Sequence, residues 1–452
     1  MTPGEDGSVR RPNLVLVIAD QWRAGCLGFL GEDPVRPPAL DELAERPRVL
    51  TRAVSNYPVC SPCRAMLMTG RYPYGNGVHL NVNSATAEPG VGMRPETRCW
   101  SDVLADEGYA LGYIGKWHLE APVPADAAAG EGVREDGRVW DAYTAPDRRH
   151  GFGFWYSHDR RDDHARPHYW TGDTPREAPA GVDLWSAEHG TDVALSFLDG
   201  AARDYHRGGT PIALVLSYNP PRQPFDQVPQ RYLDGYSTRS ARELLTRPNV
   251  DWDRPEAAEA ARAAPSYYAA ITGVDHRIGR VLAALDEHPL TGDTFVVFTS
   301  DHGMQLGSHG LMYKNVPYEE STRDHGDGDA AHAWNQKTVL RSTLGPRPHR
   351  GRDPLRTSGP ALDARALTGH RTSQIHGLQL GPLARTTPRS ARRSGRDPEP
   401  GSGGEPRRPP RTAARDAAPM APGHRGHGLP QTPLLPDGVA SQTRDRVFAI
   451  PY

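Results

Sequence analysis

Three short apolar runs, far apart in the sequence, have the pattern of strands that are buried on both faces. They cover residues 14–19, 211–217 and 294–299, and each consists almost entirely of aliphatic, β-branched and aromatic residues. Unbroken apolar runs of this length are typical of parallel strands covered by helices, whereas half-exposed strands alternate apolar and polar positions. We therefore expect these runs near the centre of one parallel sheet.

Segments with helical periodicity separate these runs. Apolar residues recur at three- and four-residue spacing in residues 39–45, 101–107, 186–198 and 267–287. Strands that alternate with helices predict an α/β fold with a large, mostly parallel central sheet flanked by helices. With 452 residues the chain is long enough for one large α/β domain and a smaller one.

Polar residues follow each of the three predicted strands directly. Asp20 and Gln21 follow the first, Asn219 follows the second, and Asp301 and His302 follow the third. Ligands of open α/β sheets bind at the carboxyl ends of the strands, so these side chains are expected to meet in one crevice. For any single strand, an ordinary turn residue is an equally good interpretation.

The apolar pattern ends at residue 323. Residues 11–323 are therefore predicted to form the structured domain. Arg, Pro and Gly make up 52 of the 129 residues in 324–452, a composition that cannot bury enough apolar surface to offset chain entropy. We expect this tail to be disordered or badly folded. Because a GC-rich gene read out of frame yields such a composition, we interpret the tail as a frameshift product.

Charge differs sharply between the two parts. Residues 1–323 carry 33 Lys and Arg against 44 Asp and Glu, whereas residues 324–452 carry 20 against 11. A basic arm can bind nucleic acid, but this one lacks interleaved aromatic residues and a recognition motif, so no nucleic-acid partner is expected. Lysine is rare, with three residues against 50 Arg, so a lysine that persists is informative.

The chain shows no sign of export or membrane insertion. Its first 11 residues lack an apolar core, and no stretch reaches the roughly 18 apolar residues that a membrane span needs. Four cysteines in a chain of this length do not make a disulfide framework. We expect a cytoplasmic protein without membrane partners.

The pentapeptide Cys-Ser-Pro-Cys-Arg at residues 60–64 carries the first chemical signal. Ser61 is a good N-cap, Pro62 suits the first helical position, and Gly70 is a stop signal. Cys60 is then expected just before a helix N-terminus, where backbone N–H groups favour an anion. The same spacing also resembles the redox motif of thioredoxins, whereas zinc binding would need a second ligand pair.

Further motifs along the chain decide between these interpretations of residues 60–64. Cys60-x-Pro-x-Arg64 is followed by Gly-Lys-Trp-His-Leu at 115–119, then by Ser-Asp-His-Gly at 300–303, and then by Gly-Ser-His-Gly at 307–310 with Lys314. In this order they resemble the formylglycine-dependent (type I) sulfatases of the alkaline-phosphatase-like superfamily. The resemblance covers about residues 11–323. Family members continue into a C-terminal subdomain, which we expect to be missing or garbled here.

The resemblance implies a nucleophile and a metal. In the family, the cysteine at the position of Cys60 is oxidised to formylglycine by a separate formylglycine-generating enzyme, and one hydroxyl of the hydrated aldehyde attacks sulfur. The metal is Ca²⁺, a hard cation that prefers oxygen ligands. The implied ligands are Asp20, Gln21, Asp301, His302 and the modified Cys60. Gln21 and His302 stand where Asp and Asn are usual, which leaves Mn²⁺ or Mg²⁺ open.

The resemblance also assigns the remaining roles. Lys116 and Lys314 would bind sulfate oxygens, Arg64 would orient the hydrated aldehyde, and His118 would accept its proton when the sulfated enzyme breaks down. Arg222 occupies the position of the histidine proposed as general acid. Since arginine is no proton donor near neutral pH, it would act by charge on sulfate or on the leaving group.

The predicted function is hydrolysis of a small-molecule or saccharide sulfate ester to an alcohol or phenol, as in arylsulfatases. Three alternatives stay open. They are a phosphonate or phosphodiester hydrolase of the same superfamily, a catalytically compromised truncated homologue, and a CxPC redox protein. The redox protein would need both Cys60 and Cys63, whereas a sulfatase should tolerate Cys63→Ser.

Overall fold

The computed structural model describes residues 11–45, 48–50, 53–128, 137–172, 174–205, 209–288, 290, 293–322 and 338–342. Within these residues one nine-stranded sheet has the order β2-β9-β8-β1-β7-β3-β4-β5-β6. The strands are β1 (Asn13–Asp20), β2 (Arg48–Leu50), β3 (Ala110–Lys116), β4 (Phe154–His158), β5 (His168–Thr171), β6 (Ala180–Gly181), β7 (Ile212–Pro221), β8 (Thr294–Ser300) and β9 (Thr338–Ser342).

The middle of the sheet is parallel and its edges are antiparallel. The run β8-β1-β7-β3-β4 is parallel throughout, while β5 and β6 on one side and β9 and β2 on the other pair antiparallel. The three strands predicted from apolar runs are β1, β7 and β8. They are direct neighbours, which confirms the prediction of a mostly parallel α/β sheet.

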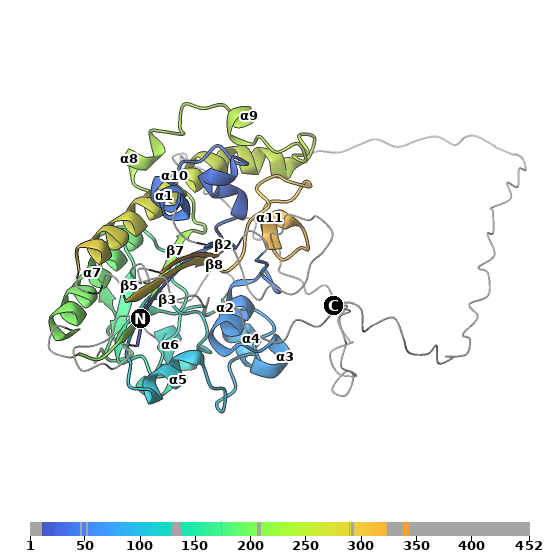
Figure 1. The fold of residues 1–452 in the computed structure, drawn as a ribbon. Helices are drawn as coiled ribbons and strands as arrows, with labels where there is room; N and C mark the ends of the chain where they lie inside the picture. The colour runs from blue at the N-terminus through green and yellow to red at the C-terminus, as the bar shows by residue number, and fades with distance from the viewer. Residues whose placement is uncertain are drawn as a thin grey trace, which may run out of the picture. The chain divides into compact units, whose positions relative to one another are not determined.

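Helices cover both faces of the sheet. Their bounds are α1 (Pro38–Glu45), α2 (Cys60–Thr69), α3 (Pro73–Asn76), α4 (Ser84–Ala87), α5 (Trp100–Asp106), α6 (Pro124–Ala128), α7 (Ser186–Tyr205), α8 (Gln230–Leu233), α9 (Ala241–Leu244), α10 (Pro255–Glu287) and α11 (Glu319–Thr322). Short 3₁₀ helices lie at Ala24–Cys26, Gly28–Leu30 and Pro146–Arg148. Figure 1 shows α7 and α10 on one side of the sheet and α2 and α5 on the other.

Alternate residues of β1 enter two separate hydrophobic cores. Val15 and Val17 belong to the core that includes α1, α7 and α10, whereas Leu16 and Ile18 belong to the core that includes α2 and β3. A strand with helices on both faces needs apolar residues at every position, which is why β1 reads as an unbroken apolar run. The arrangement leaves the carboxyl edge of the sheet as the place where polar residues gather.

Two predicted helix starts differ from the structure. α10 begins at Pro255, twelve residues before the predicted start, and continues through Pro265. Val59, not Ser61, is the N-cap of α2, so Cys60 lies in the first turn rather than just before it. The stop at Gly70 is confirmed, since this residue is the C-cap and has φ of 63°, in the left-handed region that glycine tolerates.

One strand lies beyond the predicted end of the domain at residue 323. β9 pairs antiparallel with β8, Phe298 facing Val339, and it also pairs with β2. At least this segment of the Arg- and Pro-rich part therefore joins the sheet. Apart from β9, residues 323–452 are outside the described part of the chain, so the predicted disorder and frameshift stay predictions.

Candidate active site

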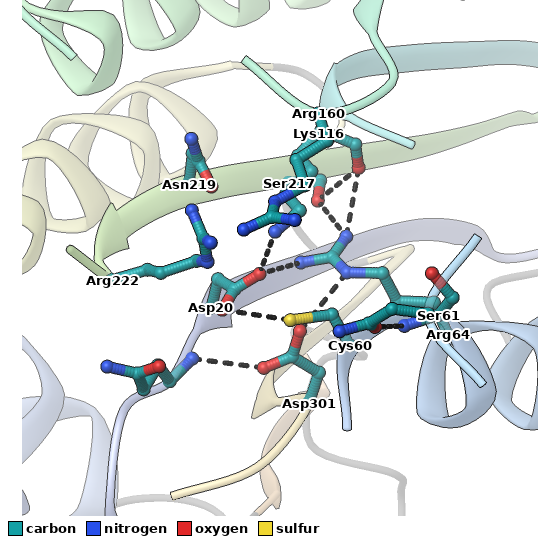
Figure 2. A network of polar contacts seen from close by, with 12 residues as sticks. Asp20, Cys60, Ser61, Arg64, Lys116, Arg160, Ser217, Asn219, Arg222 and Asp301 are labelled. Atoms are coloured by element: carbon teal, nitrogen blue, oxygen red, sulfur yellow. Dashed lines mark hydrogen bonds and ion pairs between the residues drawn. The ribbon is translucent and has the colours of Figure 1, made fainter. Parts of the chain in front are cut away.

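Polar side chains from separate segments meet at the carboxyl edge of the sheet. Asp20 ends β1, Lys116 ends β3, Asp301 follows β8, and Cys60 opens α2 (Figure 2). All four are fully or almost fully buried. The carboxyl ends of β1 and β8 therefore bring Asp20 and Asp301 together as predicted, whereas Asn219 of β7 donates instead to the carbonyl oxygen of Arg161 at 2.6 Å.

Cys60 lies at the centre of this cluster. Its Sγ is 3.3 Å from Nε2 of His302, 3.4 Å from Nζ of Lys314 and 3.8 Å from Oδ1 of Asp20. Lys116 forms an ion pair with Asp20. The Asp20 carboxylate thus contacts both the Cys60 sulfur and a second ammonium group. Cations and potential metal ligands thus surround the same atom.

The guanidinium group of Arg64 organises the cluster from one turn further along α2. It contacts Oδ2 of Asp20 at 3.3 Å and Oδ2 of Asp301 at 3.1 Å. It also donates to the carbonyl oxygen of Lys116 at 2.9 Å and to Oγ of Ser217 at 2.8 Å. Arg64 therefore fixes both carboxylates and the ends of β3 and β7, rather than pointing at Cys60 itself.

The charges of the cluster shift the pKa values of its members. Burial and Asp20 oppose ionisation of the Cys60 thiol, but Lys116, Lys314 and His302 outweigh them and lower its pKa from 9.0 to about 5. Burial lowers the pKa of Lys116 to about 8, although Asp20 acts in the opposite direction. Burial disfavours the Asp20 carboxylate, yet Lys116 and the other cations hold its pKa well below its ordinary value. The site is built to hold an anionic group at position 60.

Four residues form a set that can hold a metal ion. The ligand atoms of Asp20, Cys60, Asp301 and His302 all lie within 4.8 Å of one another. Nδ1 of His302 is 3.0 Å from the carbonyl oxygen of Gly303, and because a carbonyl only accepts, Nδ1 carries the hydrogen. Nε2 of the same ring faces Oδ1 of Asp20 at 3.8 Å and Oδ1 of Asp301 at 3.6 Å. Two carboxylate oxygens and an imidazole nitrogen that face one another fit a bound cation.

Gln21, the fifth predicted metal ligand, borders this set but is otherwise engaged. Its backbone N–H donates to Oδ1 of Asp301 at 3.0 Å, and its Oε1 accepts from Nζ of Lys314 at 2.7 Å. Its backbone has φ of 65°, a conformation that turns the chain sharply after β1. Gln21 thus links the metal set to Lys314.

His118 lies in the turn after β3. It is fully buried, and neither ring nitrogen has a hydrogen-bond partner among the described residues. Burial, together with Lys116 and three arginines, lowers its pKa well below 6.5. The neutral imidazole is therefore the stable form, as a proton acceptor requires.

Arg222 does not join the cluster by direct contact. Its Nη1 forms an ion pair with Asp162, which also pairs with Arg160 at 3.5 Å, and donates to the carbonyl oxygen of Gln223 at 3.2 Å. It follows β7 and lies beside Asn219, apart from Cys60 (Figure 2). Arg222 thus flanks the site with a charge that Asp162 balances.

Several supporting residues were missed by the sequence reasoning. Ser217 donates from Oγ to the carbonyl oxygen of Lys116, and Ser55 donates to the carbonyl oxygen of Asp301, both at 2.8 Å. Asn81 accepts the N–H of Ser61 at 3.1 Å in the first turn of α2. Only Ser217 carried a signal, as the last residue of a predicted buried strand. The other two are side chains of loops without a pattern.

Cys63 has an environment different from that of Cys60. Its Sγ is 3.4 Å from Oγ of Ser55, and burial together with Asp301 raises the pKa of its thiol. The two cysteines of the motif thus differ, with an acidic thiol at Cys60 and an inert one at Cys63.

The parallel sheet and the polar cluster at its carboxyl edge define a protein of the alkaline-phosphatase-like class. A family model described as Sulfatase matches residues 12–338. The chain belongs to the sulfatase family. Among the helices of the described residues, none combines the length and apolar character that crossing a bilayer would require.

Relatives of known description support this assignment. An endo-4-O-sulfatase of Bacteroides thetaiotaomicron is 38% identical over 69% of this chain and 62% of its own length. An ulvan-active sulfatase of Formosa agariphila is 34% identical over 69% of this chain and 55% of its own length. The crystal structure of the Bacteroides fragilis sulfatase YidJ superposes with a TM-score of 0.68 at 38% identity, covering 76% of this chain and 71% of the other. The chain spans less than two thirds of both curated relatives.

Proposed function

We propose that this protein hydrolyses sulfate monoesters, with position 60 as the nucleophile. The observation that carries the proposal is the environment of the Cys60 Sγ, which belongs to the potential metal set, lies 3.3 Å from Nε2 of His302 and lies 3.4 Å from Nζ of Lys314. A sulfate monoester is an anion that repels nucleophiles, and its hydrolysis needs cations that neutralise the sulfate oxygens. Formylglycine at position 60 would supply a hydrated aldehyde as nucleophile.

Each remaining side chain has a place in this chemistry. Lys116 and Lys314 would bind sulfate oxygens through charge-assisted hydrogen bonds. Arg64 would keep Asp20 and Asp301 oriented toward the metal. Neutral His118 would accept a proton from the hydrated aldehyde at position 60. A divalent ion, Ca²⁺ by family resemblance with Mn²⁺ or Mg²⁺ as alternatives, would polarise sulfate and nucleophile.

The relatives guide the choice of substrate. One is named for 4-O-sulfate and one for ulvan. We therefore infer a sulfated saccharide, rather than a simple aryl sulfate, as the natural substrate.

The test begins with the state of residue 60. Because Cys60 is buried, a formylglycine-generating enzyme must reach it before the domain folds, so the two proteins are coexpressed. Mass spectrometry of the tryptic peptide 53–64 should show the aldehyde. The modified protein is then assayed in parallel on a sulfate monoester and a phosphonate monoester. Faster hydrolysis of the phosphonate would replace the sulfatase proposal by its closest alternative, and an unmodified thiol would remove the nucleophile.

Metal removal is expected to stop the reaction. Dialysis against a chelator should lower kcat at least about 100-fold, because the carboxylates of Asp20 and Asp301 would then face sulfate without a cation between them. Adding back Ca²⁺, Mn²⁺ or Mg²⁺ one at a time should restore it and identify the ion. Unchanged activity after metal analysis has shown loss of the ion would contradict the assigned metal set.

Because Arg222 stands in place of a proton donor, we expect the protein to hydrolyse sulfate esters with good leaving groups fastest. An arginine paired with Asp162 cannot protonate a departing oxygen, so a phenolate should leave far more readily than an alkoxide. We expect nitrophenyl sulfate to be hydrolysed at least about 100-fold faster than an alkyl sulfate of similar size. Arg222→His should narrow this ratio. Equal rates for the two esters in the unaltered protein would show that another group donates the proton.

A further inference from the structure

The loop after β4 runs beside the turn that carries His118. β3 and β4 are parallel neighbours in which Lys116 faces His158. The N–H of Trp117 then donates to the carbonyl oxygen of His158 at 2.8 Å. The two segments therefore leave the sheet together, and Asp159 is the first residue of the loop after β4.

Asp159 in this loop binds the backbone that directly follows His118. Its Oδ1 accepts the N–H of Leu119 at 2.9 Å and the N–H of Glu120 at 3.0 Å. His118 itself has φ of 58°, in the left-handed region that side chains other than glycine rarely adopt. The two hydrogen bonds hold the turn in this conformation and satisfy donors that would otherwise be orphaned in the interior.

Asp159 is itself held in place by a second carboxylate. Oδ1 of Asp141 accepts the N–H of Asp159 at 2.8 Å and that of Arg160 at 2.9 Å. Oδ2 of Asp141 lies 2.6 Å from Nε2 of His168 in β5. A continuous series of hydrogen bonds thus runs from β5 to the turn at His118.

We propose that Asp159 is a positioning residue for His118, fixing through the N–H groups of Leu119 and Glu120 the buried orientation in which the imidazole accepts a proton. The proposal rests on the proton-acceptor role of His118 proposed above. Asp159 is almost fully buried, and its Oδ2 has no hydrogen-bond partner among the described residues. Asp159 therefore needs only one oxygen, Oδ1, as the acceptor for both hydrogen bonds of this positioning role.

The neutral carboxylic acid can perform this role. Burial raises the pKa of Asp159 well above its ordinary value, and the N–H groups of Glu120 and Leu119 offset only part of that effect. Asparagine has the shape of a protonated aspartic acid and keeps the acceptor oxygen. Asp159→Asn should therefore preserve the turn, whereas Asp159→Ala should release it.

Asp275 offers a matched control. Its carboxylate accepts two consecutive backbone N–H groups, those of Ala39 and Leu40, both at 2.9 Å, at the start of α1. It is also buried, and burial raises its pKa to about 7. Asp275→Ala therefore removes the same kind of interaction from a helix that contributes no residue to the site.

The experiment follows the titration of His118 by NMR in protein with ¹³C-labelled histidine, the signal being assigned by its loss in His118→Ala. The charged groups that face His118 are those of Lys116, Arg160, Arg64 and Arg222, and all four remain in every variant. In the unaltered protein, Asp159→Asn and Asp275→Ala, we expect the pKa of His118 below 6.5. In Asp159→Ala the turn is no longer held, so water should reach His118 and raise its pKa by about one unit or more.

Kinetics give a second readout. Asp159→Ala should lower kcat by about 100-fold with little change in KM, because His118 is misplaced while the sulfate-binding lysines are not. Asp159→Asn should restore kcat. If Asp159→Ala does not fold, Asp159→Ser, whose hydroxyl is too short to span the gap, takes its place.

Two outcomes would overturn the positioning role. One is an unchanged His118 titration in Asp159→Ala, and the other is an equal shift in Asp275→Ala, which would reveal general loosening. Absence of sulfate ester hydrolysis in the unaltered, aldehyde-bearing protein would instead refute the proposed function. The NMR titration decides the role of Asp159 in either case.

Discussion

Replacing Cys60 by alanine is expected to abolish sulfate ester hydrolysis, lowering kcat by about 10,000-fold or more. The side chain at this position lies against His302, Lys314 and Asp20 at 3.3 to 3.8 Å, so a methyl group there leaves the metal set and the cations without a nucleophile. The measurement is kcat on nitrophenyl sulfate for protein coexpressed with the formylglycine-generating enzyme.

Cys63→Ser is the matched control for this variant. Cys63 is the other cysteine of the motif, but its Sγ lies 3.4 Å from Oγ of Ser55 and is not among the four grouped ligand atoms, so the serine variant should keep most of the activity. A CxPC redox protein would lose its function with either substitution. Equal loss in the two variants would therefore count against position 60 as the sole nucleophile and in favour of a dithiol.

The sequence predicted the centre of the fold well because physical constraints there leave few options. β1, β7 and β8 are covered on both faces, so each reads as an unbroken apolar run, and their carboxyl ends meet as parallel topology requires. Asp20 and Asp301 could be placed in one crevice from this argument alone. Their pairing with Cys60 and Lys116 depended on the family resemblance.

The parts that could not be predicted depend on contacts between loops. Asp141, Asp159 and Asp162 lie in segments without periodicity, and each acts by binding backbone N–H groups or a guanidinium group from elsewhere in the chain. No spacing in the sequence identifies such a partner. The start of α2 was misplaced for a related reason, since Asn81 binds the N–H of Ser61 and the serine is not needed as a cap.

The second large effect is expected for Lys116→Met, which should lower kcat/KM about 100- to 1,000-fold. Methionine keeps the length and apolar stem of the side chain but removes the charge. Lys116 is fully buried, pairs with Asp20 and lies beside the nucleophile, so its ammonium group is desolvated and strengthens a contact to sulfate. Arg148→Met, which removes a half-exposed cation paired with Glu120, is the control and should leave kcat/KM nearly unchanged.

The pH dependence of the same variant separates a catalytic role from a structural one. The pKa of Lys116 is lowered to about 8 by burial, so its ammonium group, and with it activity, should be lost as pH rises through 8. Between pH 8 and about 10.4 the unfolded chain would hold this proton while the folded protein does not, so the contribution of Lys116 to stability increases with pH in that window. A decline in kcat/KM above pH 8 without a lower melting temperature is therefore expected, and Lys116→Met should not show that decline. If Lys116→Met shows the same decline in kcat/KM above pH 8, the decline belongs to the titration of another group.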